Sequence, residues 1–290
     1  MARAGNRPRN SRNPRKWSWQ LLRAGAFRLD GGGMFGVVPK SIWSRLVEPD
    51  EHNRIPLQTN CLLLDDGDEK ILIESGFGDK WSDKERGFYD LERRTIVNAL
   101  REVGVEPEQI DRVIVTHLHF DHAAGLTRLD QSGRAAPTFP KARIFVQKIE
   151  WDDALENKST MNRTYLRNHL DPIADRVELL ENEREAFPES GITVCPMLGH
   201  TWGMQAIRFE DEQGTVCFPG DVLPTVNHVG LPFSLGYDML PYHNMISKHR
   251  LYVRAISDDW RLVLDHEPGH AVVRVQADAE RPDRFVLVRA

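Results

Sequence analysis

Short apolar runs separated by polar turns make up most of the chain, and they predict strands more often than helices. Residues 60–65 and 70–74 are apolar runs on either side of Asp66-Gly67-Asp68, a composition typical of a hairpin turn. Residues 113–115 are entirely apolar, which indicates a buried strand. Further strands are expected at residues 142–146, 192–195, 204–209, 215–218, 262–264, 271–275 and 285–288.

Three segments carry a helical pattern instead. Apolar side chains recur at helical spacing in residues 91–103, and Gly104 is a stop signal. Residues 149–156 are also expected to be helical, as are residues 244–256 with Asn244 as the N-terminal cap. The order of elements is strands, helix, strands, helix, strands. It fits an α/β sandwich in which two sheets face each other and helices cover the outside.

Composition narrows the class of partner. The formal net charge of −5 is mild, so we expect no nucleic-acid partner. No apolar run approaches the ~20 residues of a membrane span, so we expect no membrane partner either.

A length of 290 residues allows one large domain or two small ones. We favour one, because no Pro/Gly/Ser linker divides the candidate site residues described below.

The first residues of the chain differ in composition from the rest. Residues 1–16 hold six basic residues, no acidic residue and little to bury, which favours a disordered tail over a basic binding arm. We therefore expect a disordered basic tail at residues 1–18 and a single domain at residues 19–290.

Cys61, Cys195 and Cys217 lie in apolar runs without a CxxC pair. This pattern predicts buried free thiols in a reducing compartment, and thus a cytoplasmic protein.

The segment after the apolar run 113–115 carries the candidate chemistry. His117, His119, Asp121 and His122 lie within six positions. Imidazole and carboxylate groups are ligands of zinc, manganese and iron. Gathering four such groups without a metal would leave them poorly paired. His117 and His119 can face one position while Asp121 and His122 face another, so the spacing suggests two metals.

The motif His117-Leu118-His119-Phe120-Asp121-His122 after a strand resembles the signature of the metallo-β-lactamase superfamily. The resemblance implies a four-layered αββα sandwich with two metals at one edge between the sheets. It also implies three downstream ligands, each of which has a candidate here: His200 in the segment 198–201, Asp221 in 218–221 and His266 in 264–266. The matching pattern spans residues 58–270.

The resemblance implies a division of these residues into two sites. One metal is held by His117, His119 and His200, the other by Asp121, His122 and His266, and Asp221 bridges both. The metals are expected to be Zn²⁺, with manganese, iron or cobalt as alternatives. A hydroxide shared by the metals then attacks an ester carbonyl, and Asp121 or a water gives a proton to the leaving alkoxide.

Two positions indicate a branch of the superfamily. Asp221 stands where the largest class of true β-lactamases has a cysteine, and His119 stands where the flavodiiron oxidoreductases have an acid. The 24 residues after His266 are too few for the helical substrate-binding domain of glyoxalase II. The pattern is most similar to the acyl-homoserine-lactone lactonases, which implies a zinc-dependent hydrolase that opens a small lactone and quenches quorum sensing.

The chain departs from those lactonases at the residue that helps hold the substrate carbonyl. Those lactonases place a tyrosine three residues after the bridging aspartate, where this chain has Pro224. His228, Tyr237 and Tyr242 are candidates to replace it, and we favour His228 and Tyr237 as catalytic residues together with Asp121. The Gly-rich segment 31–40 could form a lid over an acyl chain, although packing of Met34 and Phe35 in the core or an interface is favoured.

Three alternatives stay open. The same site could hydrolyse a β-lactam, thioester, phosphotriester or phosphodiester. It could hold iron and perform redox chemistry. The chain could also be a non-catalytic binding protein, although its full set of ligands argues against this. A homodimer is compatible with the sequence.

Overall fold

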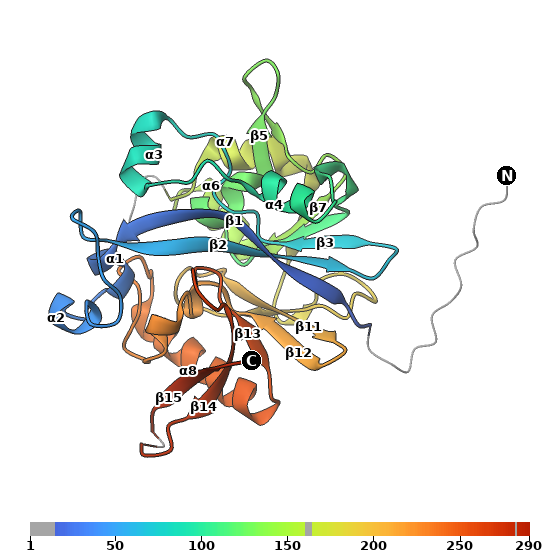
Figure 1. Cartoon of the computed structure of the whole chain (residues 1–290). Coiled ribbons are helices and arrows are strands. Elements are labelled where there is room, and N and C mark those ends of the chain that lie inside the picture. Colours follow the sequence, from blue (N-terminus) through green and yellow to red (C-terminus); the bar gives the residue numbers. More distant parts are fainter. Residues whose placement is uncertain (1–14, 160–163, 282) are drawn as a thin grey trace.

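The computed structural model describes residues 15–159, 164–281 and 283–290. Two β-sheets lie face to face, and helices cover their outer faces (Figure 1). The first sheet has the order β1-β2-β3-β4-β7-β8, and the second has the order β15-β14-β13-β12-β11-β10-β9. This arrangement confirms the predicted four-layered αββα sandwich.

The strands of the first sheet are β1 (Ser18–Asp30), β2 (Arg54–Asp65), β3 (Lys70–Ile73), β4 (Arg112–Ile114), β7 (Arg143–Gln147) and β8 (Val177–Leu180). Those of the second are β9 (Arg184–Glu185), β10 (Thr193–Pro196), β11 (Gln205–Asp211), β12 (Gly214–Phe218), β13 (Arg261–Val263), β14 (Val272–Ala277) and β15 (Phe285–Arg289). A small third sheet pairs β5 (Thr127–Leu129) with β6 (Ala135–Pro137). The helices are α1 (Gly31–Phe35), α2 (Lys40–Trp43), α3 (Asp83–Tyr89), α4 (Ile96–Glu102), α5 (Phe120–Ala123), α6 (Lys148–Leu155), α7 (Arg167–Leu170) and α8 (Pro241–Ser257).

Alternation along the strands explains the layers. Ile114 of β4 packs between the sheets with Ile207 and Phe218 of the second sheet. Its neighbour Val113 points the other way and packs under α4 and α6. Because both faces of β4 are buried, its apolar run is continuous rather than alternating. On the far side, α8 covers the second sheet (Figure 1).

The predicted strands and the β2–β3 hairpin are confirmed, with boundaries shifted by no more than two residues except in β2, which begins at Arg54 rather than at residue 60. The predicted helix at residues 91–103 begins later, at Ile96, because Thr95 and Asn98 form a capping box. Leu91 packs in a separate cluster with Phe27. Asn244 as a helix cap was wrong: α8 begins at Pro241, whose fixed φ suits a first helical position.

The N-terminal boundary at residue 18 is also wrong. Trp17 is 1% exposed, and its indole Nε1 donates a hydrogen bond to the Ser190 carbonyl. Arg15 forms an ion pair with Asp66. The remainder of the expected tail, residues 1–14, lies outside the described residues. We propose that residues 15–290 form one domain, because Trp17 packs between the two sheets.

The first part of the Gly-rich segment forms α1, which packs against the domain. Met34 and Phe35 are buried, and the Phe35 ring stacks on Trp43 at 5.3 Å between centroids. This agrees with the favoured core packing. The three cysteines are free and buried, as predicted. Within the described residues, no helix has the length and apolar character needed to cross a membrane.

Candidate metal centre

The loop after β4 carries the first four candidate ligands. His117 and His119 lie between β4 and α5, and Asp121 and His122 lie on α5. The loop is pinned to the segment after β3, where Glu74 accepts a hydrogen bond from the Thr116 amide at 2.7 Å. A Cβ at Gly125 would lie 2.0 Å from the Ser75 carbonyl oxygen, so only glycine permits this close approach. The loop is therefore held rigidly against its neighbour.

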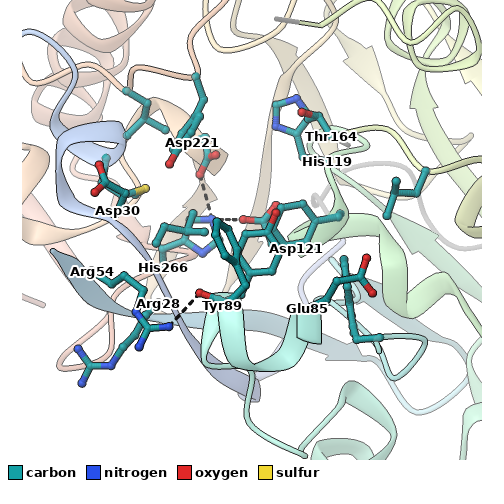
Figure 2. A pocket seen from close by; sticks show the side chains of 18 of the residues that line it. Arg28, Asp30, Arg54, Glu85, Tyr89, His119, Asp121, Thr164, Asp221 and His266 are labelled. Atoms are coloured by element: carbon teal, nitrogen blue, oxygen red, sulfur yellow. Dashed lines mark hydrogen bonds and ion pairs between the residues drawn. The ribbon is translucent and has the colours of Figure 1, made fainter. Parts of the chain in front are cut away.

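The other three candidates come from the second sheet. His200 follows β10, Asp221 lies in a 3₁₀ turn (Gly220–Val222) after β12, and His266 follows β13. Gly220 has a φ of +59°, which lets the chain turn sharply directly before Asp221. These strand ends meet the β4 loop at one edge of the sandwich. The structure thus brings together all seven residues predicted as metal ligands. Figure 2 shows His119, Asp121, Asp221 and His266 at the cavity wall.

The first cluster joins His117, His119, His200 and Asp221, whose ligand atoms all lie within 4.8 Å of one another. His200 Nε2 lies 2.9 Å from His119 Nδ1 and 3.1 Å from Asp221 Oδ2. His117 Nε2 lies 3.9 Å from the same Asp221 oxygen. All four side chains are buried.

The second cluster joins His122, His266, Asp221 and Asp265 within the same limit of 4.8 Å. Asp221 Oδ1 lies 3.2 Å from His266 Nε2, and the Nε2 atoms of His266 and His122 are 3.2 Å apart. Asp121, which the sequence assigned to this site, lies 3.5 Å from His266 Nε2 through Oδ2. Asp221 therefore lies between the clusters: Oδ1 is next to His266, and Oδ2 is next to His200 and lies 3.8 Å from His122 Nε2.

The donor atoms fit divalent metals. His117 Nε2 and Asp221 Oδ1 are buried and have no hydrogen-bond partner among the described residues. Burial, together with repulsion from neighbouring imidazoles, holds the pKa of His117 well below its usual value, so the ring is neutral and able to bind a metal. Burial alone would raise the pKa of Asp221, but attraction to His200 and His266 outweighs it and holds that pKa well below its usual value. Imidazoles and carboxylates gathered in this way could hold two divalent ions.

Further side chains orient the ligands, and the sequence did not predict them. Three imidazoles contact a protein acceptor through their second nitrogen: His200 with Asp238 at 2.8 Å, His122 with Glu74 at 3.4 Å and His266 with the Gln58 carbonyl at 2.9 Å. Such partners fix the ring orientation and the tautomer. Glu74 and Asp265 had a usable signal, since each is an acid directly after an apolar strand. Asp238 had none.

A cavity of about 1190 Å³ opens beside the two clusters (Figure 2). Its wall includes His119, Asp121, Asp221 and His266. Much of the remaining lining is apolar or aromatic: Leu29, Met34, Trp81, Phe88, Tyr89, Phe120, Leu166, Leu235 and Tyr237. The rings of Trp81, Tyr89 and Phe120 pack on one another at 5.2–6.1 Å. The candidate metal centre thus lies against a large apolar chamber.

The structure separates the predicted carbonyl-binding candidates. Tyr237 lines the cavity, whereas Tyr242 is 69% exposed on α8. His228 is not among the described residues that line the cavity. Its ring is fully buried, bonded to Thr225 Oγ1 at 2.8 Å and to the Met34 carbonyl at 2.8 Å. The prediction for His228 is therefore corrected, because both ring nitrogens are used in packing α1 against the loop after β12.

The buried His228 is expected to make stability depend on pH. Burial, and then the nearby Lys248 ammonium, lower the pKa of His228 to about 3 in the folded protein, against an ordinary value of 6.5. Its contribution is complete above pH 6.5 and is lost as the pH falls from 6.5 towards 3, because only the unfolded chain takes up the proton. Urea unfolding at pH 7 and pH 5 should show His228→Gln losing less stability on acidification than wild type, by up to about 2 kcal/mol. Equal losses would contradict this.

Comparison with known proteins agrees with this geometry. A family model described as the metallo-beta-lactamase superfamily matches residues 54–266. An N-acyl homoserine lactonase of Bacillus thuringiensis is 30% identical over 178 residues, which cover 58% of this chain and 62% of the lactonase. The match thus spans less than two thirds of that relative.

Solved structures extend the likeness to nearly the whole chain. A probable metal-dependent hydrolase from Staphylococcus aureus has a TM-score of 0.83 and 30% identity, covering 96% of this chain and 99% of that one. A dizinc quorum-quenching lactonase, solved with the product N-hexanoyl-L-homoserine, has a TM-score of 0.76 and 17% identity, covering 95% and 97%. At that identity the second likeness shows the fold alone.

Proposed function

Because the chain belongs to the metallo-β-lactamase superfamily, we propose that it is a two-metal hydrolase that opens a lactone carrying an apolar acyl group. One observation carries this proposal. Asp221 lies between the two clusters of buried imidazoles, with Oδ2 3.1 Å from His200 and Oδ1 3.2 Å from His266, and both clusters lie at the wall of an apolar cavity. Zinc is the metal we expect, and manganese, iron and cobalt suit the same donors.

The protein's side chains divide the work. A bound pair of divalent ions supplies a water deprotonated near neutral pH and polarises the carbonyl. His117, His119 and His200 form a cradle on one side of Asp221, and burial holds the pKa of His117 and His119 well below its usual value. Asp121 faces the cavity from the other side and lies 3.5 Å from His266 Nε2. From there its carboxyl group can pass a proton to the ester oxygen as the C–O bond breaks.

The cavity favours a substrate with an apolar tail. The ring of a lactone fills only a small part of about 1190 Å³. The aromatic wall formed by Trp81, Tyr89 and Phe120 begins directly beside His119 and Asp121. Burial of a methylene group against such a wall contributes about 0.8 kcal/mol. A long acyl chain would therefore bind more tightly than a short one.

We propose that Tyr237 takes the role of the tyrosine that the lactonases have at the position of Pro224. Burial raises the pKa of its hydroxyl, so the group stays protonated and can donate a hydrogen bond to the substrate carbonyl. Tyr237→Phe should lower kcat/KM on the order of a hundredfold, the loss typical of one such donor. Tyr242→Phe, the same change on an exposed tyrosine, should leave it unchanged. Equal activity of both variants would remove Tyr237 from the mechanism.

Gly33 offers a second test of the same role. A Cβ at Gly33 would lie 2.1 Å from the Tyr237 hydroxyl oxygen. Gly33→Ala should therefore push the hydroxyl away without removing it, and kcat/KM should fall as in Tyr237→Phe. The double variant should be no slower than Tyr237→Phe alone, because both changes remove one interaction. Additive losses would contradict the assignment.

A substrate panel tests the proposed function. Zinc-loaded protein is assayed with N-acyl homoserine lactones of rising chain length, and then with a β-lactam, a thioester, a phosphotriester and a phosphodiester. We expect the lactones to be preferred, with kcat/KM rising with acyl length. Preference for another substrate class would change the proposed substrate but would leave the proposal of a hydrolase standing. The homodimer and the cytoplasmic location stay predictions.

A further inference from the structure

A buried carboxylate outside the two metal clusters connects the loops that carry them. Glu150 lies on α6 and is 0% exposed. Its Oε1 accepts hydrogen bonds from the Leu118 amide at 2.9 Å and from the Tyr165 hydroxyl at 3.0 Å. Its Oε2 accepts a bond from the Thr201 hydroxyl at 2.5 Å. A single side chain thus holds three donors from three separate segments.

Two of these donors adjoin the ligands of the first cluster. Leu118 lies between His117 and His119, and Thr201 directly follows His200. The three imidazoles of this cluster come from these two loops, which belong to different sheets. Gln205 joins the bases of the two loops, through its amide to the Thr116 carbonyl and through its side chain to the Val115 carbonyl. Glu150 joins them at the residues next to the imidazoles, with one oxygen on each loop.

The third donor reaches the cavity wall. The ring of Tyr165 is buried beside the His119 ring, with 5.1 Å between centroids. Its neighbours in the chain, Thr164 and Leu166, line the cavity. A movement of this wall segment would therefore displace Glu150 and His119 as well.

The position of Glu150 is closely defined. A Cβ at Gly203 would lie 2.3 Å from the Glu150 amide nitrogen, so α6 packs directly on the backbone of the His200 loop. Burying a carboxylate is costly unless its oxygens are well satisfied. Three donors, one of them a backbone amide, meet that requirement. Their geometry gives the two loops little freedom to separate.

We propose that Glu150 is a positioning residue that fixes the spacing of the two loops of the first cluster, and that Tyr165 links this spacing to the cavity wall. This inference rests on the proposed metal site but not on the lactone. The second cluster has no direct bond to Glu150 among the described residues. Loss of Glu150 should therefore weaken one of the two metals and spare the other.

Metal affinity tests this directly. Glu150→Met keeps roughly the length of the side chain but removes both accepting oxygens, so the Leu118 amide and the Thr201 hydroxyl both lose their partner. Competition with a chelator for zinc should show one of the two ions bound about 10- to 100-fold more weakly, as for other partners of metal ligands. The second ion should keep its wild-type affinity. In Co²⁺-loaded protein, the visible absorption bands of one site should shift.

A matched control separates positioning from simple loss of a buried charge. Asp153 lies on the same helix, is buried and pairs with Lys158 at 3.0 Å. Asp153→Asn should bind both zinc ions as wild type does. Thr201→Val removes only the bond to the His200 loop and is a smaller change to the core. It should weaken the same zinc ion and leave the other unchanged.

Other outcomes overturn the proposal. If Glu150→Met binds both ions with wild-type affinity, Glu150 does not position the loops. If Glu150→Met and Thr201→Val weaken both ions equally, or if Asp153→Asn does the same, the effect is general destabilisation. Because the readout is metal binding, a failure of lactone hydrolysis would leave this result intact.

Discussion

Asp221→Asn is expected to lower kcat/KM of the metal-loaded protein by roughly a thousandfold or more. Asp221 Oδ2 lies 3.1 Å from His200 Nε2, and its Oδ1 lies 3.2 Å from His266 Nε2. Asparagine has nearly the same shape, but one of its two terminal atoms is an NH₂ group that cannot bind a cation. The variant therefore loses the negative charge and one ligand atom at the point that joins the clusters.

Metal content and a second variant complete this prediction. Asp221→Asn should retain fewer than two zinc ions per chain after gel filtration, and its circular dichroism should match that of the wild type. Asp153→Asn makes the same chemical change in a buried residue on α6 and should retain activity. A fully active Asp221→Asn would mean that the two clusters do not share this carboxylate.

Removal of metal is expected to abolish activity and to lower thermal stability together. Without an ion, the buried His117 Nε2 has no hydrogen-bond partner among the described residues, and the imidazoles of the two clusters crowd against one another. Zinc at about a hundred times its dissociation constant stabilises the folded state by about 2.7 kcal/mol for each site. In a chain of this size, that raises the Tm by about 5–10 °C.

Dialysis against a chelator, followed by stepwise addition of zinc, measures both effects. Activity and Tm should fall on dialysis and recover as zinc is restored, with activity recovered fully only near two ions per chain. A control sample dialysed without chelator should keep both. Hydrolysis that persists in protein shown to be free of metal would contradict the proposed mechanism.

The sequence predicted the sheets and the ligand loop well because their signals are local. The apolar run of β4 and the four ligands that follow it lie within ten consecutive residues. The apolar runs that predict β10, β11 and β12 likewise depend on immediate neighbours. Boundaries were less accurate where a cap decides them, as at Thr95, or where Trp17 finds its partner in Ser190 far along the chain.

Residues that act across the fold could not be predicted in this way. Glu150 meets Leu118 and Thr201 from positions 32 and 51 residues away, and Asp238 meets His200 over 38 residues. No local pattern signals such contacts. His228 shows the opposite error, because nearness to Asp221 in sequence suggested a site role. The 3₁₀ turn after Thr225 directs its ring towards Met34 instead.

Ring opening of a long-chain N-acyl homoserine lactone tests the central claim most directly. Zinc-loaded wild type and Asp221→Asn are compared by acid release at constant pH, with the metal content of each sample measured in parallel. The account predicts rapid turnover by wild type and only background hydrolysis by the variant. Wild type that holds two zinc ions and opens the lactone no faster than Asp221→Asn would contradict it.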